Sequence, residues 1–274
     1  MRVEEVKAVL ESLDKRPTKR LGQHFLIDES VMHRQVSFAA LGPEDTVLEI
    51  GPGLGALTEV LLGTGAKVVA VEQDQAFCRF LARRFGDAIQ LVQADAVKAF
   101  LPMFNKVVSN LPYQISSPIT FKLLDAGFEV AVLMLQKEFA ERMIAKSGTD
   151  EYGRLSVGVY YRADCEIVMN VPRRSFWPEP EVDSCVVRLT PRPSPFEVED
   201  EEMFKRVTRA LFSHRRKMVL NSLRSEPEFR ELIGDRSGDD IDGIPYASKR
   251  VEELTPEMIG ELSDGLVRLR RRGQ

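Results

Sequence analysis

The chain has 274 residues, of which 43% are hydrophobic and 29% are charged, and its formal net charge is −4. A chain of this size can bury a full core, and we expect one large domain and one small domain. The mild acidity excludes a global field that would attract nucleic acid or a membrane, so binding to a polyanion must use local basic patches. The three cysteines (Cys78, Cys165 and Cys185) are scattered without a C-x-x-C pair, which is typical of reduced thiols in a cytoplasmic protein.

The N-terminal segment predicts two helices and no targeting signal. Its first residues, MRVEEVKAVLESLDKR, include acids and lack the apolar core of a signal peptide, and no later run is long enough to span a membrane. Apolar residues at helical spacing predict a helix within residues 1–20 that stops at Pro17, and a second helix over residues 29–41. The stretch LGQHFLID between them is interpreted as a loop.

From residue 45, short buried strands alternate with helices. The expected strands are TVLEI, KVVAVEQD, IQLVQAD, NKVVSN and EVAVLML, and the last expected helix of this series is QKEFAERMIAKSG. This alternation is typical of βαβ units, so we predict an α/β fold with a parallel sheet and helices on both faces. Two further strands, CEIVMNV and SCVVRLTP, are expected to form an antiparallel hairpin at one edge of the sheet.

The stretch PRPSPFEVEDEE, rich in proline and then in acid, is interpreted as a linker. After it the sequence shows only helical patterns, namely FKRVTRALFSHRRKMVLNSLR, the region around FRELI, and TPEMIGELSDGLVRLRR. We therefore predict a catalytic domain over residues 1–192 and a small all-helical domain over residues 193–274.

Three glycines, Gly51, Gly53 and Gly55, lie directly between the first strand of the sheet and its helix. Glycine permits a sharp turn and the close approach of a ligand, and the amides at the start of the helix then face that ligand. Glu72 ends the next strand, where a carboxylate can accept hydrogen bonds from ribose hydroxyls. Together these features predict a nucleoside-containing cofactor at the carboxyl edge of the sheet. Because GPGLGA also fits the relaxed dinucleotide fingerprint, the kind of nucleoside stays open at this point.

Asp95 ends the third strand and has two interpretations. As an acceptor for an adenine amine it would suit S-adenosylmethionine, whereas a cofactor with a pyrophosphate would not need it. As a helix N-cap it would be structural. Taken alone, the residue favours neither interpretation.

The stretch NLPY, Asn110 to Tyr113, follows the fourth strand at the same edge of the sheet. The exocyclic amine of adenine is a poor nucleophile because its lone pair is delocalised into the ring. The Asn110 side-chain oxygen and the Leu111 carbonyl can favour a pyramidal amine, and Pro112 holds that carbonyl in place. Tyr113 offers a ring face on which an extruded base can stack. The stretch therefore predicts a clamp that positions an amine for methylation, and the alternative is a strand end capped by Asn.

These motifs together resemble one family, the ribosomal RNA small-subunit adenine N6,N6-dimethyltransferases of the KsgA type, with the Erm resistance methyltransferases as cousins. The resemblance covers nearly the whole chain and rests on seven motifs in order: RLGQHFL, LEIGPGLGALT, VEQD, QADAV, NLPYQISSP, FWPEPEVDS and FSHRRKMVLNSL. It implies a Rossmann-like S-adenosylmethionine-dependent methyltransferase sheet with helices on both faces, and a small all-helical C-terminal domain that binds rRNA or the ribosome.

The resemblance also implies roles for individual residues. Those expected to contact S-adenosylmethionine are His24, Leu26, Gly51, Gly53, Glu72, Asp95 and Asn110. Asn110 and Tyr113 would also face the target adenine, and Phe176 would lie on the opposite side of the base. Many bacterial members carry Asn at the position of His24, and His at this position indicates an archaeal-like lineage. Judged by itself, a lone His in an apolar loop is more often structural.

Because the chain is acidic overall, rRNA binding is expected to use basic patches that contact phosphates without reading sequence. The residues expected to bind RNA are Arg173, Arg174, Arg215, Arg216 and Lys217. Two further basic patches are Lys15, Arg16, Lys19 and Arg20, and Arg268, Arg270, Arg271 and Arg272. The triplet at 215–217 sits among apolar residues and is predicted to project from a packed helix. The alternative for each patch is a solvated helix face or a frayed tail.

The leading hypothesis is an S-adenosylmethionine-dependent enzyme that dimethylates N6 of two adjacent adenines, in a hairpin near the 3′ end of small-subunit rRNA, during ribosome biogenesis. We expect a cytoplasmic monomer that acts on rRNA within a pre-ribosomal particle, with no membrane partner and no metal. One alternative is an Erm-like enzyme acting on large-subunit rRNA, which the basic C-terminal segment and FWPEPEVDS disfavour. A second is an RNA-binding assembly protein whose methylation is dispensable, which the intact catalytic positions disfavour. A third, a dinucleotide-dependent oxidoreductase, leaves NLPY without a purpose.

Overall fold

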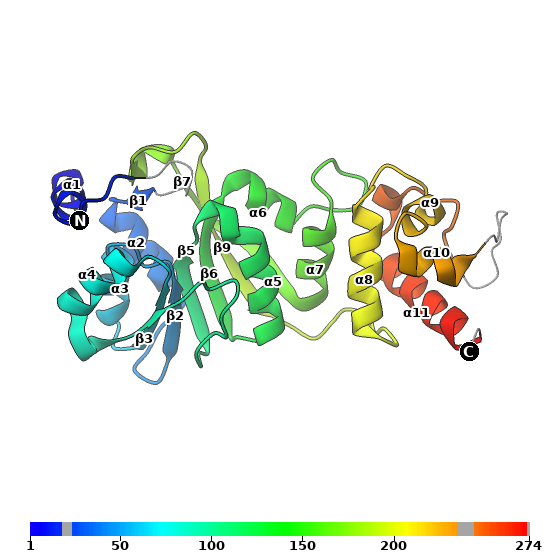
Figure 1. Cartoon of the computed structure of the whole chain (residues 1–274), viewed down its shortest axis with the longest axis horizontal. Coiled ribbons are helices and arrows are strands. Elements are labelled where there is room, and N and C mark those ends of the chain that lie inside the picture. Colours follow the sequence, from blue (N-terminus) through cyan, green and yellow to red (C-terminus); the bar gives the residue numbers. More distant parts are fainter. Residues whose placement is uncertain (18–23, 235–243, 273–274) are drawn as a thin grey trace. The chain divides into compact units, whose positions relative to one another are not determined.

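The structure, a computed structural model, describes residues 1–17, 24–234 and 244–272 of the chain (Figure 1). The chain divides into two compact units, the first consisting of Met1–Ala140 and Asp164–Pro191 and the second of Glu141–Ala163 and Arg192–Gln274. It therefore leaves the first unit after Ala140, returns at Asp164 and leaves again after Pro191. In this division residues 141–163 belong to the second unit, whereas the sequence analysis assigns them to the catalytic domain.

The first unit is built on a seven-stranded sheet with the strand order β4-β3-β2-β5-β6-β9-β7. Its strands are β2 (Thr46–Ile50), β3 (Lys67–Glu72), β4 (Ile89–Gln93), β5 (Lys106–Asn110), β6 (Val130–Gln136), β7 (Ala163–Val171) and β9 (Ser184–Pro191). The pairs β2–β3, β3–β4, β2–β5 and β5–β6 are parallel, and β9 runs antiparallel to β6. The expected α/β fold is thus confirmed, and the two late strands lie side by side at one edge of the sheet, as expected.

Both faces of this sheet are buried, as in other sheets with parallel strands and covering helices. On one face, Val47 and Val68 belong to an apolar cluster shared with α2 (Glu29–Ser37) and α3 (Ala56–Leu62). Their neighbours Leu48 and Val69 point to the opposite face, since side chains alternate along a strand, and they are buried too. The other helices that contribute to this unit are α1 (Val3–Ser12), α4 (Gln75–Phe85), α5 (Ser116–Ala126) and the start of α6 (Lys137–Met143).

A second, two-stranded sheet joins segments that are far apart in the sequence. Strand β1 (Phe25–Leu26) pairs antiparallel with β8 (Phe176–Trp177), and the amide of Ile27 donates to the carbonyl of Ser175 at 2.9 Å. The interpretation of LGQHFLID as a loop is therefore wrong at Phe25 and Leu26. A strand of two residues has no periodicity to detect, because only its distant partner defines it. This pairing brings two of the seven motifs together.

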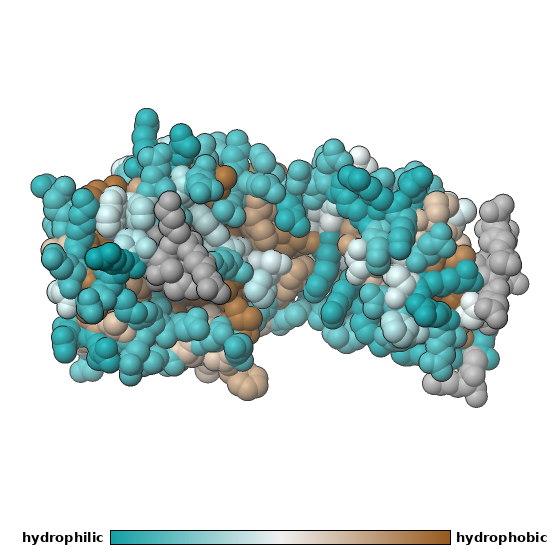
Figure 2. Space-filling view, turned by 45° about the horizontal axis from the view of Figure 1, so that its top comes forward, coloured by the Kyte–Doolittle hydropathy of each residue, from teal (hydrophilic) through white to brown (hydrophobic). Residues whose placement is uncertain are grey.

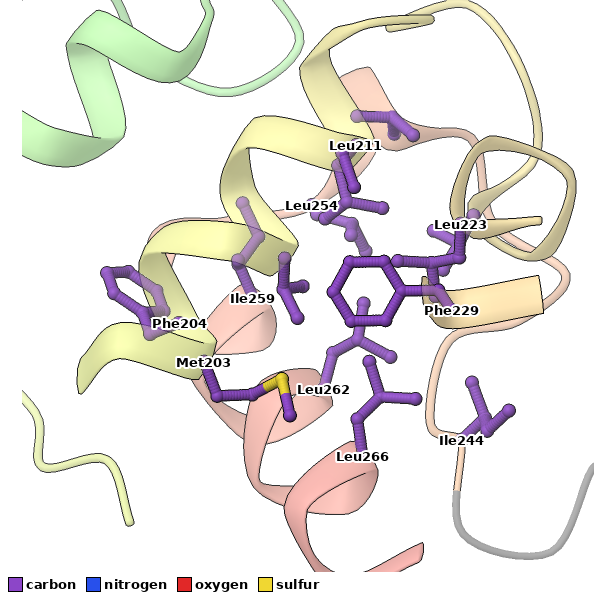
Figure 3. Close-up of a cluster of buried hydrophobic side chains, with 14 of the residues drawn as sticks. Met203, Phe204, Leu211, Leu223, Phe229, Ile244, Leu254, Ile259, Leu262 and Leu266 are labelled. Atoms are coloured by element: carbon purple, nitrogen blue, oxygen red, sulfur yellow. The ribbon is translucent and has the colours of Figure 1, made fainter. Parts of the chain in front are cut away.

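The second unit is helical, as predicted. Its helices, besides the end of α6, are α7 (Arg154–Arg162), α8 (Glu201–Phe212), α9 (Val219–Leu223), α10 (Pro227–Ile233) and α11 (Pro256–Arg272). Figure 3 shows its core, in which Met203 from α8 points toward Leu262 and Leu266 from α11. Phe204 and Leu211, also from α8, belong to the same cluster of buried side chains. Among the described residues, short 3₁₀ helices of both units are η2 (Gly86–Ala88), η3 (Tyr113–Ile115), η4 (Arg173–Ser175) and η5 (Val251–Glu253). No helix in the described part of the chain has both the length and the apolar character needed to cross a membrane.

The basic segment between α8 and α9 differs from its expected form. Residues 213–217 form a turn and bend, so the prediction that the triplet at 215–217 projects from a packed helix is wrong. Residues 249–251, far away in the sequence, hold the end of this turn. The amide of Val219 donates to the carbonyl of Lys249 at 2.9 Å, and the amide of Val251 donates to the carbonyl of Lys217 at 3.0 Å. These long-range hydrogen bonds take the place of the hydrogen bonds of a helix. The local sequence could not predict them, because the partner residues lie about 30 positions away.

Candidate active site

A cavity of about 700 Å³ lies in the first unit, where strands β2, β3 and β5 end. Every residue that the sequence analysis assigns to catalysis or to the cofactor lines it: His24, Leu26, Gly51, Gly53, Glu72, Asp95, Asn110, Tyr113 and Phe176. The described residues that line the cavity do not include the five basic residues expected to bind RNA. The structure therefore brings the expected catalytic and cofactor residues together and leaves the basic residues elsewhere.

The cavity forms where the sheet changes its direction of growth. After β2 the chain adds β3 and β4 on one side and then returns to add β5 on the other, and ligands of open α/β sheets bind at such a point. The β2–β5 ladder pairs Val47 with Lys106 and Leu48 with Val107. Beyond it, the Ser109 hydroxyl accepts from the Ile50 amide at 3.2 Å and donates to the Ile50 carbonyl at 2.7 Å. A side chain thus replaces the backbone ladder at the edge of the cavity, and the main-chain groups of Ile50 stay satisfied.

The glycine turn needs glycine for two different reasons. Gly51 has a φ of 68° and Gly55 a φ of 77°, in the left-handed region that glycine favours. A Cβ at position 51 would lie 3.3 Å from Cγ and Cδ of Pro112, and a Cβ at position 55 would lie 2.9 Å from Cδ2 of Leu81. Gly51 therefore lets the turn pack on NLPY, and Gly55 lets it pack on α4.

Glu72, at the end of β3, is only 7% exposed, and its carboxylate holds the backbone of two turns. Oε2 accepts from the Gly53 amide at 3.1 Å, and Oε1 accepts from the Asp74 amide at 2.8 Å. Burial raises the pKa of Glu72, while the hydrogen bonds from the amides of Asp74 and Gly53 act in the opposite direction. Glu72 thus shapes the glycine turn as well as lining the cavity, a structural role that the sequence does not reveal.

A second acidic residue of the cavity, Glu49, is absent from the sequence-based predictions. It is 2% exposed, and its Oε2 accepts a hydrogen bond from the Thr58 hydroxyl at 2.6 Å. Burial raises the pKa of Glu49 to about 8, with a smaller contribution from the charge of Glu72, although the hydrogen bond from Thr58 opposes the shift. Its signal in the sequence is an acid inside the otherwise apolar strand TVLEI, since carboxylates are rarely buried without a partner.

Asp95 acts as a cap in the turn after β4. Its Oδ1 accepts from the amide of Val97 at 2.9 Å, and its Oδ2 lies 3.6 Å from Nζ of Lys98. No helix follows Asp95, because residues 96–98 form a turn, so Asp95 caps this turn and is not the helix N-cap that one interpretation expected. Because Asp95 also lines the cavity, its role as an acceptor for an adenine amine stays a prediction.

In NLPY the side-chain oxygen of Asn110 is buried and has no hydrogen-bond partner among the described residues. Buried polar atoms are almost always paired, so this acceptor is available to a donor from a ligand or a water molecule in the cavity. The amide of Leu111 donates to the carbonyl of Met134 at 3.3 Å, which fixes the start of the turn. Pro112 follows with a φ of −55° and a ψ of 127° and ends the strand.

Aromatic side chains and an imidazole form another wall of the cavity. The Tyr113 hydroxyl lies 2.8 Å from Oγ of Ser184, and the Tyr113 and His24 rings lie with their centroids 5.8 Å apart, inclined at 31°. Nδ1 of His24 lies 2.7 Å from the carbonyl oxygen of Pro178. Phe176 is 6% exposed and pairs with Leu26 in the two-stranded sheet. The β1–β8 pairing therefore explains how motifs from both ends of the first unit reach one cavity.

Helix α1 and the residues after it cover a further side of the cavity. Val6 and Leu13 line it, and Leu10 packs with Leu54 and Phe77 in one apolar cluster. Nζ of Lys15 lies 2.5 Å from Oδ2 of Asp74. Lys15 therefore lines the cavity and pairs with Asp74, so it is not a free cation of a basic patch. Lys19 and Arg20, which the sequence analysis placed in the same patch, lie outside the described residues.

The residues expected to bind RNA fall into paired and unpaired cations. Nε of Arg173 lies 2.9 Å from Glu179, and Nη2 of Arg215 lies 3.2 Å from Asp150, whose carbonyl also accepts from Arg215. In the C-terminal patch, Arg268, Arg270 and Arg271 pair with Glu199 or Asp200. Within the described ranges Arg174, Arg216 and Lys217 are exposed and pair with no acidic side chain.

Comparisons with known proteins agree with this site. Residues 15–244 match the family model described as "Ribosomal RNA adenine dimethylase". Several curated relatives carry the name "Probable ribosomal RNA small subunit methyltransferase A". The one from Methanosarcina acetivorans is 46% identical over 258 residues, covering 91% of this chain and 94% of its own. The one from Thermococcus gammatolerans is 47% identical over 245 residues, covering 89% and 87%.

Solved structures place the fold in the same class. A dimethyladenosine transferase from Plasmodium falciparum has a TM-score of 0.73 at 32% identity, covering 91% of this chain and 98% of its own. The 23S rRNA methyltransferase ErmE has a TM-score of 0.62 at 30% identity, covering 89% and 99%. The fold and the cavity at its switch point thus define an S-adenosylmethionine-dependent methyltransferase. The chain belongs to the ribosomal RNA adenine dimethylase family, and its cofactor is S-adenosylmethionine.

Proposed function

We propose that this enzyme dimethylates N6 of two adjacent adenines, in a hairpin near the 3′ end of small-subunit rRNA, during ribosome biogenesis. The observation that carries the proposal is the buried oxygen of Asn110, an acceptor at the cavity without a donor among the described residues. The names of the relatives from Methanosarcina acetivorans and Thermococcus gammatolerans support the choice of subunit. Because one chain forms the whole cavity, we propose a monomer, and we place it on a pre-ribosomal particle in the cytoplasm.

The cavity fits S-adenosylmethionine in size and in chemistry. Its volume of about 700 Å³ lies within the usual range for small-molecule sites, roughly 300–1,000 Å³. We assign Glu72 to the ribose hydroxyls and Asp95 to the adenine amine, while Gly51 and Gly53 allow the backbone to approach. His24, Leu26 and Asn110 complete the proposed contacts. The cofactor supplies a methyl group that is already activated on a positively charged sulfur.

The chain's own part in the reaction is to hold the target amine. An unmethylated adenine amine has two N–H groups, and the Asn110 oxygen and the Leu111 carbonyl are the two acceptors assigned to them. When these two oxygens accept hydrogen bonds from the N–H groups, they favour a pyramidal nitrogen whose lone pair can point toward the methyl group. Tyr113 and Phe176 are assigned to the two faces of the base. Positioning and electrostatics of this kind can supply most of the acceleration.

RNA binding is assigned to unpaired cations of the second unit, with Arg174 in the first. Met218 and Arg250 form an antiparallel bridge, and Nη1 of Arg250 donates to the carbonyl of Arg216 at 2.6 Å. The exposed cations on this pair of segments are Arg216, Lys217, Lys249 and Arg250, and none of them pairs with an acidic side chain in the part of the chain that the structure describes. We call these four residues the basic ladder. The net charge of the chain is −4, so we assign the phosphate contacts to a local basic cluster of this kind. In Figure 2 hydrophilic residues predominate on the visible surface of each unit. Arg215, by contrast, holds residues 150–152 and is structural.

Mass spectrometry of rRNA from cells with and without the protein tests the proposed function. The proposal expects two adjacent dimethyladenines in small-subunit rRNA that disappear when the protein is absent. Loss of a modified adenine from large-subunit rRNA instead would identify an Erm-like enzyme. If the rRNA modifications are unchanged when the protein is absent, the proposal is refuted. The remaining hypotheses would then be an RNA-binding assembly protein and an oxidoreductase.

A further inference from the structure

The ring of Tyr113 is held at its far end by the sheet. Its hydroxyl lies 2.8 Å from Oγ of Ser184, and Ser184 is completely buried. Ser184 begins β9 and pairs with Gln136 at the end of β6, so two strands fix its backbone. Because a tyrosine side chain is rigid from Cβ to its hydroxyl, a hydrogen bond at that end sets the direction of the whole ring.

The same segment also holds the neighbour of this ring. The carbonyl oxygen of Pro178 can only accept a hydrogen bond, so Nδ1 of His24, 2.7 Å away, carries the proton. The His24 ring in turn lies against Tyr113, with the centroids 5.8 Å apart. The segment from Phe176 to Ser184 therefore supports Tyr113 twice, directly through Ser184 and indirectly through His24.

We propose that Ser184 is a positioning residue for Tyr113, and that through this ring it determines how efficiently the second methyl group is added to an adenine. The inference rests on the proposed function, because it concerns the orientation of the base that Tyr113 is assigned to stack against.

The two methyl transfers place different demands on the clamp. In each transfer the nitrogen lone pair forms a carbon–nitrogen bond while the carbon–sulfur bond breaks and leaves its electron pair on sulfur. The demethylated cofactor then departs, and the proton lost from the amine passes to solvent. The first acts on an amine with two N–H groups, one for each assigned acceptor. The second acts on an amine with a single N–H group, so one of the two hydrogen bonds is gone. The orientation of the base then depends more on stacking against Tyr113. A Tyr113 ring that has lost its hydrogen bond to Ser184 should therefore slow the second transfer more than the first.

The test measures the ratio of monomethyladenine to dimethyladenine in small ribosomal subunits taken from cells that lack the protein. Ser184→Ala and Tyr113→Phe each remove the hydrogen bond, and each should raise this ratio by roughly 2- to 10-fold at equal consumption of cofactor. The double variant should resemble either single variant, because both changes delete the same interaction. Ser184→Thr keeps a hydroxyl and should restore a ratio near that of the wild type.

Ser175→Ala is the matched control, since Ser175 is also buried in this region but its hydroxyl bonds to Asp28. It should leave the ratio unchanged, and calorimetric affinity for S-adenosylmethionine should stay within about twofold in every variant. An unchanged ratio in Tyr113→Phe, or effects of the two single changes that add up in the double variant, would overturn the inference. Should Ser184→Ala fail to fold, Tyr113→Phe still decides the matter. A wild-type enzyme that forms no dimethyladenine would refute the proposed function instead, so the two failures are distinguishable.

Discussion

Gly51 and Pro112 pack so closely that a single methyl group between them would touch the proline ring. A Cβ at position 51 would lie 3.3 Å from both Cγ and Cδ of Pro112, and Gly51 has a φ of 68°. Gly51 opens the turn after β2, whereas Pro112 follows Asn110 at the end of β5. The turn assigned to the cofactor and the clamp assigned to the amine are therefore in direct contact, and a change in one should displace the other.

The first prediction concerns this contact. Gly51→Ala should cost about 1–2 kcal/mol of stability through its left-handed backbone, and it should also weaken S-adenosylmethionine binding and methyl transfer by pushing on Pro112. Gly148→Ala is the matched control, because Gly148 lies in a turn with a φ of 82° and nothing lies within 4 Å of its would-be Cβ. Calorimetric titration and thermal unfolding should show a similar loss of stability for both variants and weaker cofactor binding only for Gly51→Ala. Equal cofactor affinities would show that the contact has no bearing on the site.

The second prediction concerns Glu72. Glu72→Ala should weaken cofactor binding by roughly 10- to 150-fold, because a charge-assisted hydrogen bond is worth about 1.5–3 kcal/mol. Glu72→Gln keeps one acceptor oxygen and should lose less, since that oxygen can still hold either the Gly53 or the Asp74 amide. Titration with the cofactor measures both, and binding to ribosomal particles serves as the control that should not change. A dissociation constant equal to that of the wild type in Glu72→Ala would remove this residue from the cofactor site.

The third prediction concerns Glu49 and pH. Its pKa in the folded protein, about 8, lies above its ordinary value of 4.5, so the folded state holds the proton more tightly than the unfolded state. The stability that this proton supplies is complete below about pH 4.5, falls by about 1.4 kcal/mol per pH unit above it, and is lost once the pH passes about 8. Glu49→Gln should therefore gain stability relative to the wild type as the pH rises from 5 to about 8, and then level off.

Urea unfolding at several pH values measures this difference. A difference between Glu49→Gln and the wild type that stays constant from pH 5 to 9 would mean that Glu49 is ionised in the folded protein.

The fourth prediction separates RNA-binding cations from structural ones. Replacing Arg216 and Lys217 together by alanine should weaken binding to the small ribosomal subunit and lower the log–log salt slope by about 1.4–1.8 units, if each makes one phosphate contact. Removing Arg268 and Arg271 takes away the same charge, but both pair with Glu199, and this double variant should retain most of the slope. Particle binding at several salt concentrations compares them. Identical slopes for the wild type and the Arg216/Lys217 variant would move the RNA path away from the basic ladder.

The strands that carry the site could be predicted from the sequence because they are buried on both faces and strongly apolar, as in TVLEI and KVVAVE. Residues at their carboxyl ends, such as Glu72 and Asn110, follow once the strands are known, since parallel strands bring those ends to one edge. The β1–β8 pairing could not be predicted, because Phe25 and Leu26 become a strand only when Phe176 and Trp177 lie beside them. For the same reason, only the resemblance to the family predicts that His24 belongs to the site, and its local sequence pattern does not.

The sequence also could not predict the roles of residues that depend on tertiary contacts. Helix α7 (Arg154–Arg162) lies in a stretch that suggested no element, and Arg215 looks like its two basic neighbours although it bonds to Asp150 and Tyr152. The double role of Glu72, toward the cavity and toward the Gly53 amide, depends on a contact 19 residues away. Charge and hydropathy describe what a side chain prefers, and only the fold decides which partner it meets.

The central claim is that Asn110 presents an adenine amine for methylation, and Asn110→Ala tests it most directly. The measurement is methyl incorporation into undermethylated small ribosomal subunits, with circular dichroism to verify the fold. Asn105→Ala serves as the control, because Asn105 lies just before the same strand but bonds only to Thr46 and Asp45 through its side chain. We expect Asn110→Ala to keep its fold and to lose nearly all methyl transfer, whereas Asn105→Ala should lose stability and keep its activity while folded. Near-normal methylation by a folded Asn110→Ala enzyme would contradict the central claim.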